Sequence, residues 1–204
     1  MGRLSKEDVV AFFDRLAPYW DDEIIIDERK IETILDAAGV KVGSRVLDVA
    51  CGTGVLFPFY ARRGVEHVAA VDISSEMIKI AQSKTNDPRF QILCADIESL
   101  EGTGDYDCCV IYNAFPHFSE PERLITMLSD WLKPGGRLTV AHSMSIDELN
   151  QHHAASAASV SRRMLLLSDM IALFERRFYV DTAVSDDEKY IVSGTLLPRG
   201  YNDL

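Results

Sequence analysis

Residues 46–56 run Val46-Leu47-Asp48-Val49-Ala50-Cys51-Gly52-Thr53-Gly54-Val55-Leu56, and this stretch decides the fold. The apolar run before the glycines is typical of a buried strand, and the apolar residues after them indicate the start of a helix. Gly52 and Gly54 let the backbone adopt open dihedral angles and approach a ligand closely. Because open α/β sheets bind ligands at the carboxyl ends of their strands, the stretch predicts a strand, a ligand-binding turn and a helix.

Short apolar runs of the same kind recur along the chain and indicate further buried parallel strands. Together with 45–50, these runs cover 67–71, 90–94, 106–112 and 137–142. Helices are expected between them at 54–63, 75–84 and 120–132. Pro134 ends the last of these helices, and Gly135-Gly136 turns the chain into its strand. Because a parallel sheet requires crossover helices, the alternation predicts a doubly wound α/β fold.

The segment after the fifth strand has a different pattern. A short helix is expected near 146–155 and a longer core helix at 160–177. Apolar runs at 178–184 and 189–197 then flank a polar turn, which is typical of an antiparallel hairpin. The complete prediction is a mostly parallel, doubly wound seven-stranded sheet with a C-terminal antiparallel hairpin and helices on both faces.

Two amphipathic helices are expected before the first strand. The first covers 6–17, with Ser5 as its N-cap and Pro18 as its end, and the second covers 26–38 and ends at Gly39. Residues 1–40 are expected to form a lid over the top of the sheet and the pocket there. No repeat, low-complexity tract or linker interrupts the sequence, so residues 1–204 are treated as one domain.

Composition narrows the classes of partner. The net charge is −11 and basic residues cluster only in pairs, which argues against nucleic acid. No apolar run approaches the roughly 20 residues that span a bilayer, so no membrane insertion is expected. The N-terminus turns acidic before any apolar stretch, unlike a secretory signal, and predicts a cytoplasmic protein. The four cysteines form no C-x-x-C pair and are expected to be reduced core residues. Monomer and dimer both stay open.

The charge near the glycine turn indicates which class of ligand binds. A dinucleotide motif would place a third glycine where Phe57 stands, and Asp48 would put negative charge near a pyrophosphate. S-adenosylmethionine carries an ammonium and a sulfonium and has no phosphate, so an acid at this turn is favourable. Asp72 ends the second strand, where a carboxylate can accept from both ribose hydroxyls. Asp96 and Ile97 follow the third strand and are expected to frame adenine.

Taken in order, these motifs resemble the class I S-adenosylmethionine-dependent methyltransferases, especially the small-molecule group that includes quinone methyltransferases. The matching segments are 46–56, Asp72, 95–97, 112–115 and 132–138, and 12–21 is similar to the segment that covers the cofactor in such enzymes. The resemblance implies a methyltransferase with S-adenosylmethionine as methyl donor and a small molecule as acceptor. The cofactor-binding residues that it implies are Asp48, Ala50, Cys51, Gly52, Gly54, Asp72, Ile73, Met77, Asp96, Ile97 and Asn113.

Histidines are the candidate catalytic residues, because an acceptor hydroxyl, protonated amine or thiol must lose a proton near neutral pH. His117 follows the fourth strand, where such enzymes commonly place acceptor-facing residues; it could equally be a loop histidine that caps the next helix. His142 ends the fifth strand, and His153 shares a helix face with Asn150 beside His152. We therefore name His117, His142 and His153 as candidates. His67, at the other end of its strand, is expected to be structural.

Several alternatives remain. Convergence of His117, His142 and His153 would permit a divalent-metal site and a metal-assisted methyltransferase, although the favoured interpretation has no metal. A protein that binds S-adenosylmethionine without transferring its methyl group would share every cofactor motif. An NAD-dependent oxidoreductase is disfavoured by Phe57 and Asp48. The atom methylated, whether oxygen, nitrogen, sulfur or carbon, is not determined by the sequence.

Overall fold

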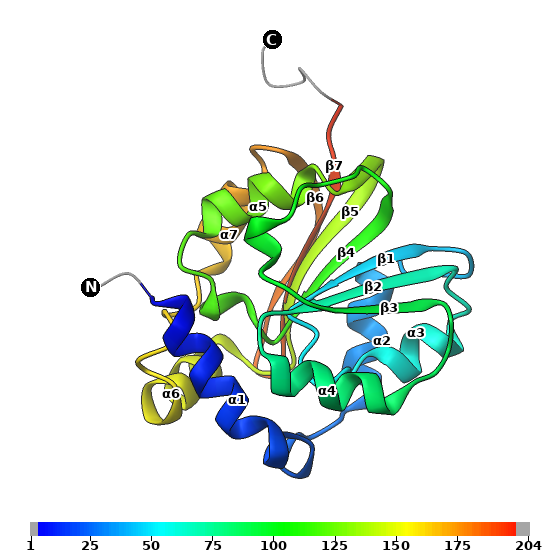
Figure 1. The fold of residues 1–204 in the computed structure, drawn as a ribbon. Coiled ribbons are helices and arrows are strands. Elements are labelled where there is room, and N and C mark those ends of the chain that lie inside the picture. Colours follow the sequence, from blue (N-terminus) through cyan, green and yellow to red (C-terminus); the bar gives the residue numbers. More distant parts are fainter. Residues whose placement is uncertain (1–3, 199–204) are drawn as a thin grey trace.

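A seven-stranded sheet forms the centre of the computed structural model, which describes residues 4–198 (Figure 1). Its strand order is β3-β2-β1-β4-β5-β7-β6. The strands are β1 (Arg45–Val49), β2 (His67–Asp72), β3 (Phe90–Cys94), β4 (Tyr106–Tyr112), β5 (Leu132–His142), β6 (Phe178–Ser185) and β7 (Tyr190–Leu196). All neighbouring pairs from β3 to β5 are parallel, and β7 is antiparallel to both β5 and β6. The predicted fold class, with its C-terminal hairpin, is confirmed.

Helices cover both faces of this sheet (Figure 1). They are α1 (Lys6–Glu23), α2 (Glu28–Ala37), α3 (Phe57–Arg62), α4 (Ser75–Lys84), α5 (Pro121–Ser129), α6 (Ile146–Ser156) and α7 (Leu167–Phe174), with 3₁₀ turns η1 (Ile97–Ser99) and η2 (Phe115–His117). One core joins the sheet to α5 and α7, and the other joins it to α2, α3 and α4. Because alternate residues of a strand face opposite sides, Leu47 and Val49 enter the first core and Val46 enters the second.

The strand order reverses between β1 and β4, and this point determines where a ligand can bind. Val49 pairs with Val71 of β2 on one side and with Ile111 of β4 on the other, so the three strands end at one edge. Connections from β1 and β4 leave this edge in opposite directions and open a crevice between them. The glycine turn predicted to bind a ligand lies at that crevice.

Helix α1 differs from its prediction at one end. Ser5 caps it as expected, accepting from the Asp8 amide at 3.3 Å, but the helix continues through Pro18 to Glu23. A proline inside a helix removes one backbone hydrogen bond and normally kinks or ends the helix. Here Asp14 and Asp21, on either side of Pro18, bind the rest of the protein through their side chains, and these contacts outweigh the loss.

The helix predicted at 160–177 is also shorter, since α7 covers only Leu167–Phe174. The backbone before it forms hydrogen bonds with other parts of the chain: the Arg162 amide donates to the Pro116 carbonyl at 2.9 Å, and the Met164 amide donates to Asn150 Oδ1 at 2.8 Å. Met170 and Phe174 enter the core as expected, whereas Leu166 is exposed. The apolar pattern of 160–177 carries no information about hydrogen-bond partners that lie far away in the sequence.

Smaller differences concern the other boundaries. Helix α2 begins at Glu28 because Asp27 caps it, accepting from two amides, and it ends before Gly39, whose φ is +70°. Strand β5 begins at Leu132. The segment Pro134-Gly135-Gly136, expected to precede this strand, therefore belongs to it. Cys94 is exposed, while the other three cysteines are buried as expected and all four are free.

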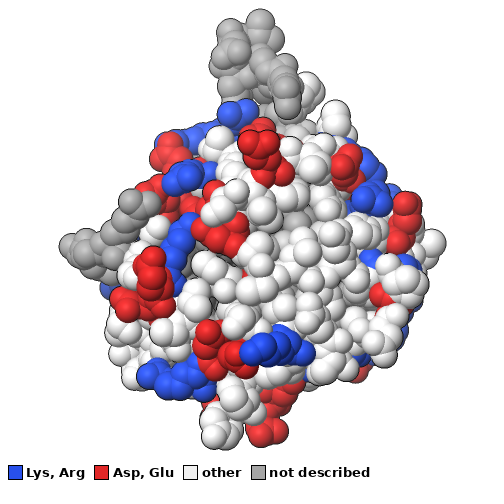
Figure 2. Space-filling model, viewed as in Figure 1, with Lys and Arg blue, Asp and Glu red and all other residues white. Residues whose placement is uncertain are grey.

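Charged side chains surround an uncharged area on the face shown in Figure 2, and lysines and arginines lie close to acids there. Fifteen described ion pairs connect opposite charges, including Lys84 with Asp21 at 2.6 Å and Lys133 with Asp107 at 2.7 Å. Between residues 4 and 198, no helix is both long enough and apolar enough to cross a membrane.

Arg137 connects the last strands to α2 and provides a test of this arrangement. Its guanidinium binds Asp181 through two nitrogens at 2.6 and 2.8 Å, and also the Ala37 carbonyl at 3.1 Å. Loss of these charge-assisted bonds in Arg137→Ala should lower the free energy of unfolding by about 2 to 3 kcal/mol in urea denaturation. Lys79→Ala, which removes an exposed pair with Glu76, is the control and should leave it nearly unchanged. Equal effects would contradict this interpretation.

Candidate functional site

The glycine turn after β1 has the backbone that its sequence predicts. Gly52 and Gly54 have φ of +54° and +80°. A Cβ on Gly54 would lie 2.5 Å from Cε2 of Phe57, so the phenylalanine at the position of a third glycine fills the space beside the turn. Ala50 and Asn113, at the ends of β1 and β4, also have positive φ values of 56° and 55°. Backbone strain in non-glycine residues concentrates at functional sites, and here it lies on both sides of the crevice.

Asp72 joins the loops that follow β1 and β2. Its Oδ2 accepts from the Gly52 amide at 2.9 Å, and its Oδ1 accepts from the Ser74 amide at 2.8 Å. Burial raises the pKa of this carboxyl although the backbone hydrogen bonds oppose the shift, and Asp14 of α1 raises it further. The carboxylate is therefore fixed at the ligand edge, close to a second acid.

Asp48 lies deeper, behind the turn. Its side chain is 2% exposed, and its Oδ2 has no hydrogen-bond partner within the described chain. Burial, followed by the charge of Asp72, raises its pKa to about 8. Asp48 also raises the pKa of the Tyr60 hydroxyl, after burial itself, and the Tyr60 side chain extends from α3 into the core that α3 shares with the sheet. Asp48 thus contributes to the electrostatics of the turn from inside the core.

A cavity of about 520 Å³ lies between α1 and the ends of β2 and β3. Ile73 and Asp96, both predicted cofactor-binding residues, line it from the sheet, and Lys6, Glu7, Val10, Ala11 and Asp14 line it from α1. Lys6 Nζ donates to Asp96 at 2.5 Å and lies 2.8 Å from Glu98. Burial alone would raise the pKa of Asp96, but the hydrogen bonds from Lys6, the Glu98 amide and Ser99, with the charge of Lys6, together outweigh it and the pKa is lowered.

Contacts of α1 with the strand-end loops extend beyond this cavity. Asp14 Oδ1 accepts from the Ser74 hydroxyl at 2.6 Å and from the Glu76 amide at 3.2 Å. Asp21 accepts from the Thr53 hydroxyl at 2.6 Å. Helix α1 is thereby bound to the loops after β1, β2 and β3. The sequence identified this segment but not its individual acids, because ordinary surface helices carry similar acids.

The remaining predicted cofactor-binding residues lie on the same strand-end loops. Met77 and Ile97 are buried at the starts of α4 and η1, and Cys51 is buried in the glycine turn. Burial, then the charges of Asp48 and Asp72, raises the pKa of the Cys51 thiol. Asn113 connects the ends of β4 and β5, accepting from the Ser143 amide at 2.9 Å. Helix α2 packs on the sheet, which confines the proposed lid to α1.

Three histidines come together beside this edge, as their candidate role requires. His117 of η2 lies against His153 of α6, with ring centroids 5.1 Å apart, and its ring meets Phe13 of α1 at 4.8 Å. His117 Nδ1 lies 2.9 Å from the Val160 carbonyl. His142 is fully buried; burial and then the charges of His153 and His117 lower its pKa to about 3.

Hydrogen-bond partners are scarce in this cluster. Within residues 4–198, both ring nitrogens of His142 lack a hydrogen-bond partner. The same is true of His153 Nδ1. Burial, then the charges of His117 and His152, lowers the pKa of His153 to about 4. His152 is exposed, and His67 lies at the start of β2 near the ring of Tyr106, as expected of a structural residue. Across the described chain, no group of three or more His, Cys, Asp or Glu side chains is arranged to hold a metal ion.

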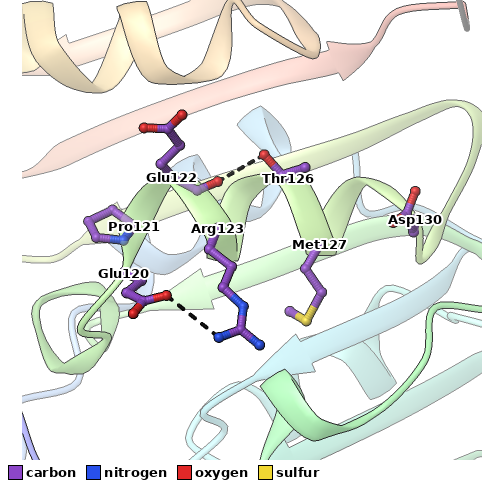
Figure 3. A pocket seen from close by; sticks show the side chains of 7 residues that line it. All are labelled: Glu120, Pro121, Glu122, Arg123, Thr126, Met127 and Asp130. Atoms are coloured by element: carbon purple, nitrogen blue, oxygen red, sulfur yellow. Dashed lines mark hydrogen bonds and ion pairs between the residues drawn. The ribbon is translucent and has the colours of Figure 1, made fainter.

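A second hollow, of about 730 Å³, lies over α5 (Figure 3). Its lining includes Glu120 and Arg123, which form an ion pair at 3.5 Å, and Thr126, whose hydroxyl donates to the Glu122 carbonyl. No candidate cofactor-binding or catalytic residue lines it. Because it lies on the outside of a helix and away from the strand ends, we do not assign it to the site.

Comparison with known proteins identifies the relatives of this chain. A family model described as a methyltransferase domain matches residues 46–136. The demethylmenaquinone methyltransferase of Renibacterium salmoninarum is 33% identical over 141 residues, which are 66% of this chain and 58% of that protein. The ubiquinone biosynthesis O-methyltransferase of Aeromonas salmonicida is 26% identical over 143 residues, which are 65% of this chain and 60% of that protein. The chain thus spans about 58–60% of the length of these relatives.

Solved methyltransferase structures have the same fold as this chain. The magnesium protoporphyrin IX methyltransferase of Synechocystis PCC 6803, solved with bound SAH, has a TM-score of 0.72 at 17% identity, with 95% of this chain and 100% of that chain covered. Likeness at such low identity concerns the fold alone. Similarity to methyltransferases in particular is shown by the sequence matches, together with the motifs at the strand ends. The chain is therefore a relative of the class I S-adenosylmethionine-dependent methyltransferases, as its sequence motifs predict.

Proposed function

We propose that this protein transfers a methyl group from S-adenosylmethionine to a small-molecule acceptor. One observation carries the proposal: acids gather at the glycine turn, with Asp72 bound to the turn itself and Asp14 beside it, and the nearby Lys6 and Lys84 are each already paired with an acid. Such a site favours a cationic nucleoside over a phosphorylated one. When bound, S-adenosylmethionine supplies a methyl carbon on a sulfonium, whose carbon–sulfur bond breaks as the acceptor atom bonds to that carbon.

The residues of the strand-end loops fit this cofactor. Gly52 and Gly54 offer backbone that can approach it closely, and Asp72 offers carboxylate oxygens for ribose hydroxyls. Asp96 and Ile97 would frame adenine, which requires Lys6 to share or release Asp96. Ala50, Cys51, Ile73, Met77 and Asn113 complete the proposed contacts, and Asp48 acts from beneath the turn.

Helix α1 would exclude water from the reacting atoms. It lies over the loops after β1, β2 and β3, and Phe13 covers His117. Methyl transfer needs orientation and a dry site more than it needs acid–base chemistry. We therefore propose α1, within the predicted 1–40 segment, as the lid, and we treat the whole chain as a single methyltransferase domain. Its free thiols suit the reducing cytoplasm that the sequence predicts.

His117 is the proposed base for an acceptor that must lose a proton. A carbonyl oxygen only accepts hydrogen bonds, so His117 Nδ1 carries the proton that binds Val160 and Nε2 keeps its lone pair. Burial lowers the pKa of His117, which keeps the ring neutral at pH 7. His142 and His153 lie beside it as further catalytic candidates.

A protein that binds S-adenosylmethionine without transferring its methyl group would keep the same strand-end loops. Formation of a methylated product distinguishes such a binding protein from the proposed methyltransferase.

Asp72→Ala tests the cofactor site. Loss of a charge-assisted pair of hydrogen bonds to ribose should weaken S-adenosylhomocysteine binding by about 1.5 to 3 kcal/mol, measured by calorimetry. Asp105→Ala, which removes an acid from the loop before β4 at the opposite edge of the sheet, is the matched control and should bind normally. Unchanged affinity in Asp72→Ala would refute the ribose role.

Asp48 should release a proton when the cofactor binds. Because its pKa in the free protein is about 8, the carboxyl is mostly protonated at pH 7, and a nearby cation lowers that pKa. Calorimetry in phosphate and in Tris at pH 7 should therefore show release of up to about one proton per S-adenosylmethionine bound. Asp48→Asn should abolish the difference between buffers. The same proton count in both proteins would assign the release to another group.

His117→Gln tests the base. Turnover of an acceptor that must lose a proton should fall by about 10²- to 10⁴-fold while S-adenosylhomocysteine affinity stays unchanged. The wild-type rate should be flat above about pH 6.5 and fall at lower pH, because only the neutral imidazole accepts a proton and its pKa lies below the usual value. A variant with normal turnover would make His117 a structural residue.

A further inference from the structure

Next to His117, the structure buries several polar groups that have no partner. His142 and Tyr190 are fully buried, and neither imidazole nitrogen and not the Tyr190 hydroxyl has a hydrogen-bond partner in residues 4–198. His153, 8% exposed, leaves Nδ1 unpartnered in the same way. We call His142, Tyr190 and His153 the polar niche.

Topology explains why these side chains meet. His142 ends β5 and lies directly opposite Tyr190 in antiparallel β7, so both side chains project from the same face of the sheet. Helix α6 carries His153 to the ring of His117, and the charges of His153 and His117 both lower the pKa of His142, after burial. The niche therefore adjoins the proposed base, at the edge where the strands end.

Unpaired polar groups of this kind are costly. Each buried donor or acceptor without a partner destabilises a protein by about 1 to 3 kcal/mol, and buried polar groups in proteins are nearly always paired. Other unpartnered groups, such as Trp131 Nε1 at the opposite edge of the sheet and Tyr60 on the other face, are not gathered beside the candidate base. The concentration beside His117 indicates that a polar group from outside the chain completes these hydrogen bonds.

The surroundings limit what that group can be. Apolar Phe115, Leu149 and Met164 belong to the core that holds Tyr190. The titratable and charged groups facing the niche are His117 of η2, His152 of α6, Arg162 after α6, Asp169 of α7 and the niche residues themselves. His152 and Asp169 are exposed, and the low pKa values of His142 and His153 leave both rings uncharged at pH 7. A cationic guest would lose its hydration there without a buried acid as counter-ion among the described residues that face the niche.

We propose that the polar niche binds a hydroxyl or carbonyl oxygen of an uncharged phenolic acceptor. This inference rests on the proposed methyl transfer. Imidazoles and a tyrosine hydroxyl can each donate to or accept from such an oxygen. A phenol, which ionises near pH 10 as tyrosine does, can pass its proton to His117 Nε2, whereas an aliphatic alcohol is a far weaker acid. The phenolic oxygen then forms its bond to the methyl carbon, and the electrons of the broken carbon–sulfur bond stay on sulfur.

Entry to the niche requires movement of α1. Phe13 contacts the His117 ring, and Val9 packs with Ala157 and Val160 of the segment after α6. An acceptor must part these contacts, and the lid would close again over it. Acceptor binding should therefore be detected best when the cofactor site is already filled.

The test measures acceptor binding apart from turnover. Protein labelled with ¹⁵N-histidine and loaded with S-adenosylhomocysteine is titrated with catechol, and the ring nitrogens of His142 and His153 are followed by NMR. Catechol should shift both, whereas the cation benzylamine should not. Tyr190→Phe, which removes one oxygen, should weaken catechol binding by about 5- to 10-fold, as expected for one hydrogen bond. Tyr106→Phe, which removes a hydroxyl from the same core at the opposite edge of the sheet, should leave it unchanged.

The outcomes separate this inference from the function on which it rests. Failure of S-adenosylhomocysteine to bind would overturn the proposed methyl transfer itself. If S-adenosylhomocysteine binds normally but catechol does not shift the ring nitrogens of His142 and His153, only the niche proposal is overturned. Equal catechol affinity in Tyr190→Phe and Tyr106→Phe would overturn it as well. A response to stoichiometric Zn²⁺ with none to catechol would make the histidines a metal site and would also overturn the proposal.

Discussion

The candidate site depends on two hydrogen bonds that the Asp72 carboxylate accepts. One carboxylate oxygen holds the Gly52 amide and the other holds the Ser74 amide, so a single side chain fixes the loops after β1 and β2. The side-chain hydroxyl of Ser74 in turn donates to Asp14 of α1. The position of α1, the shape of the glycine turn and the first turn of α4 are therefore coupled through one buried corner of the sheet.

Strain and charge both concentrate at this edge. Ala50 and Asn113 hold left-handed backbone on either side of the strand reversal, and Asn113 is kept there by its bonds to Ser143. Asp48 is buried with an unpartnered oxygen while Asp72 lies close enough to raise its pKa. A protein selected for stability alone would relieve such costs, since each destabilises the fold. Their position at the crevice agrees with a site shaped for a cationic ligand.

The candidate residues lie on two sides of the sheet edge. Ile73, Asp96 and α1 line the cavity beyond β2 and β3, whereas His117, His142 and His153 gather beyond β4 and β5. The first side is acidic and hydrogen-bonded, and the second is neutral and largely unpartnered. Helix α1 reaches both, with Asp14 on one and Phe13 on the other. A single helix therefore contacts both groups of candidate residues.

The sequence by itself determined the sheet, its strand boundaries within a few residues, and the edge at which the candidate residues lie. Apolar runs and glycine turns are local signals, because burial of a parallel strand and positive φ each impose a residue type at a given position. The tertiary structure alone decided that α1 continues past Pro18, that residues 160–166 are not helical, and that Asp48 lies inside the core. It also brought Tyr190 opposite His142. Each of these depends on a partner distant in the chain, and local patterns carry no information about such partners.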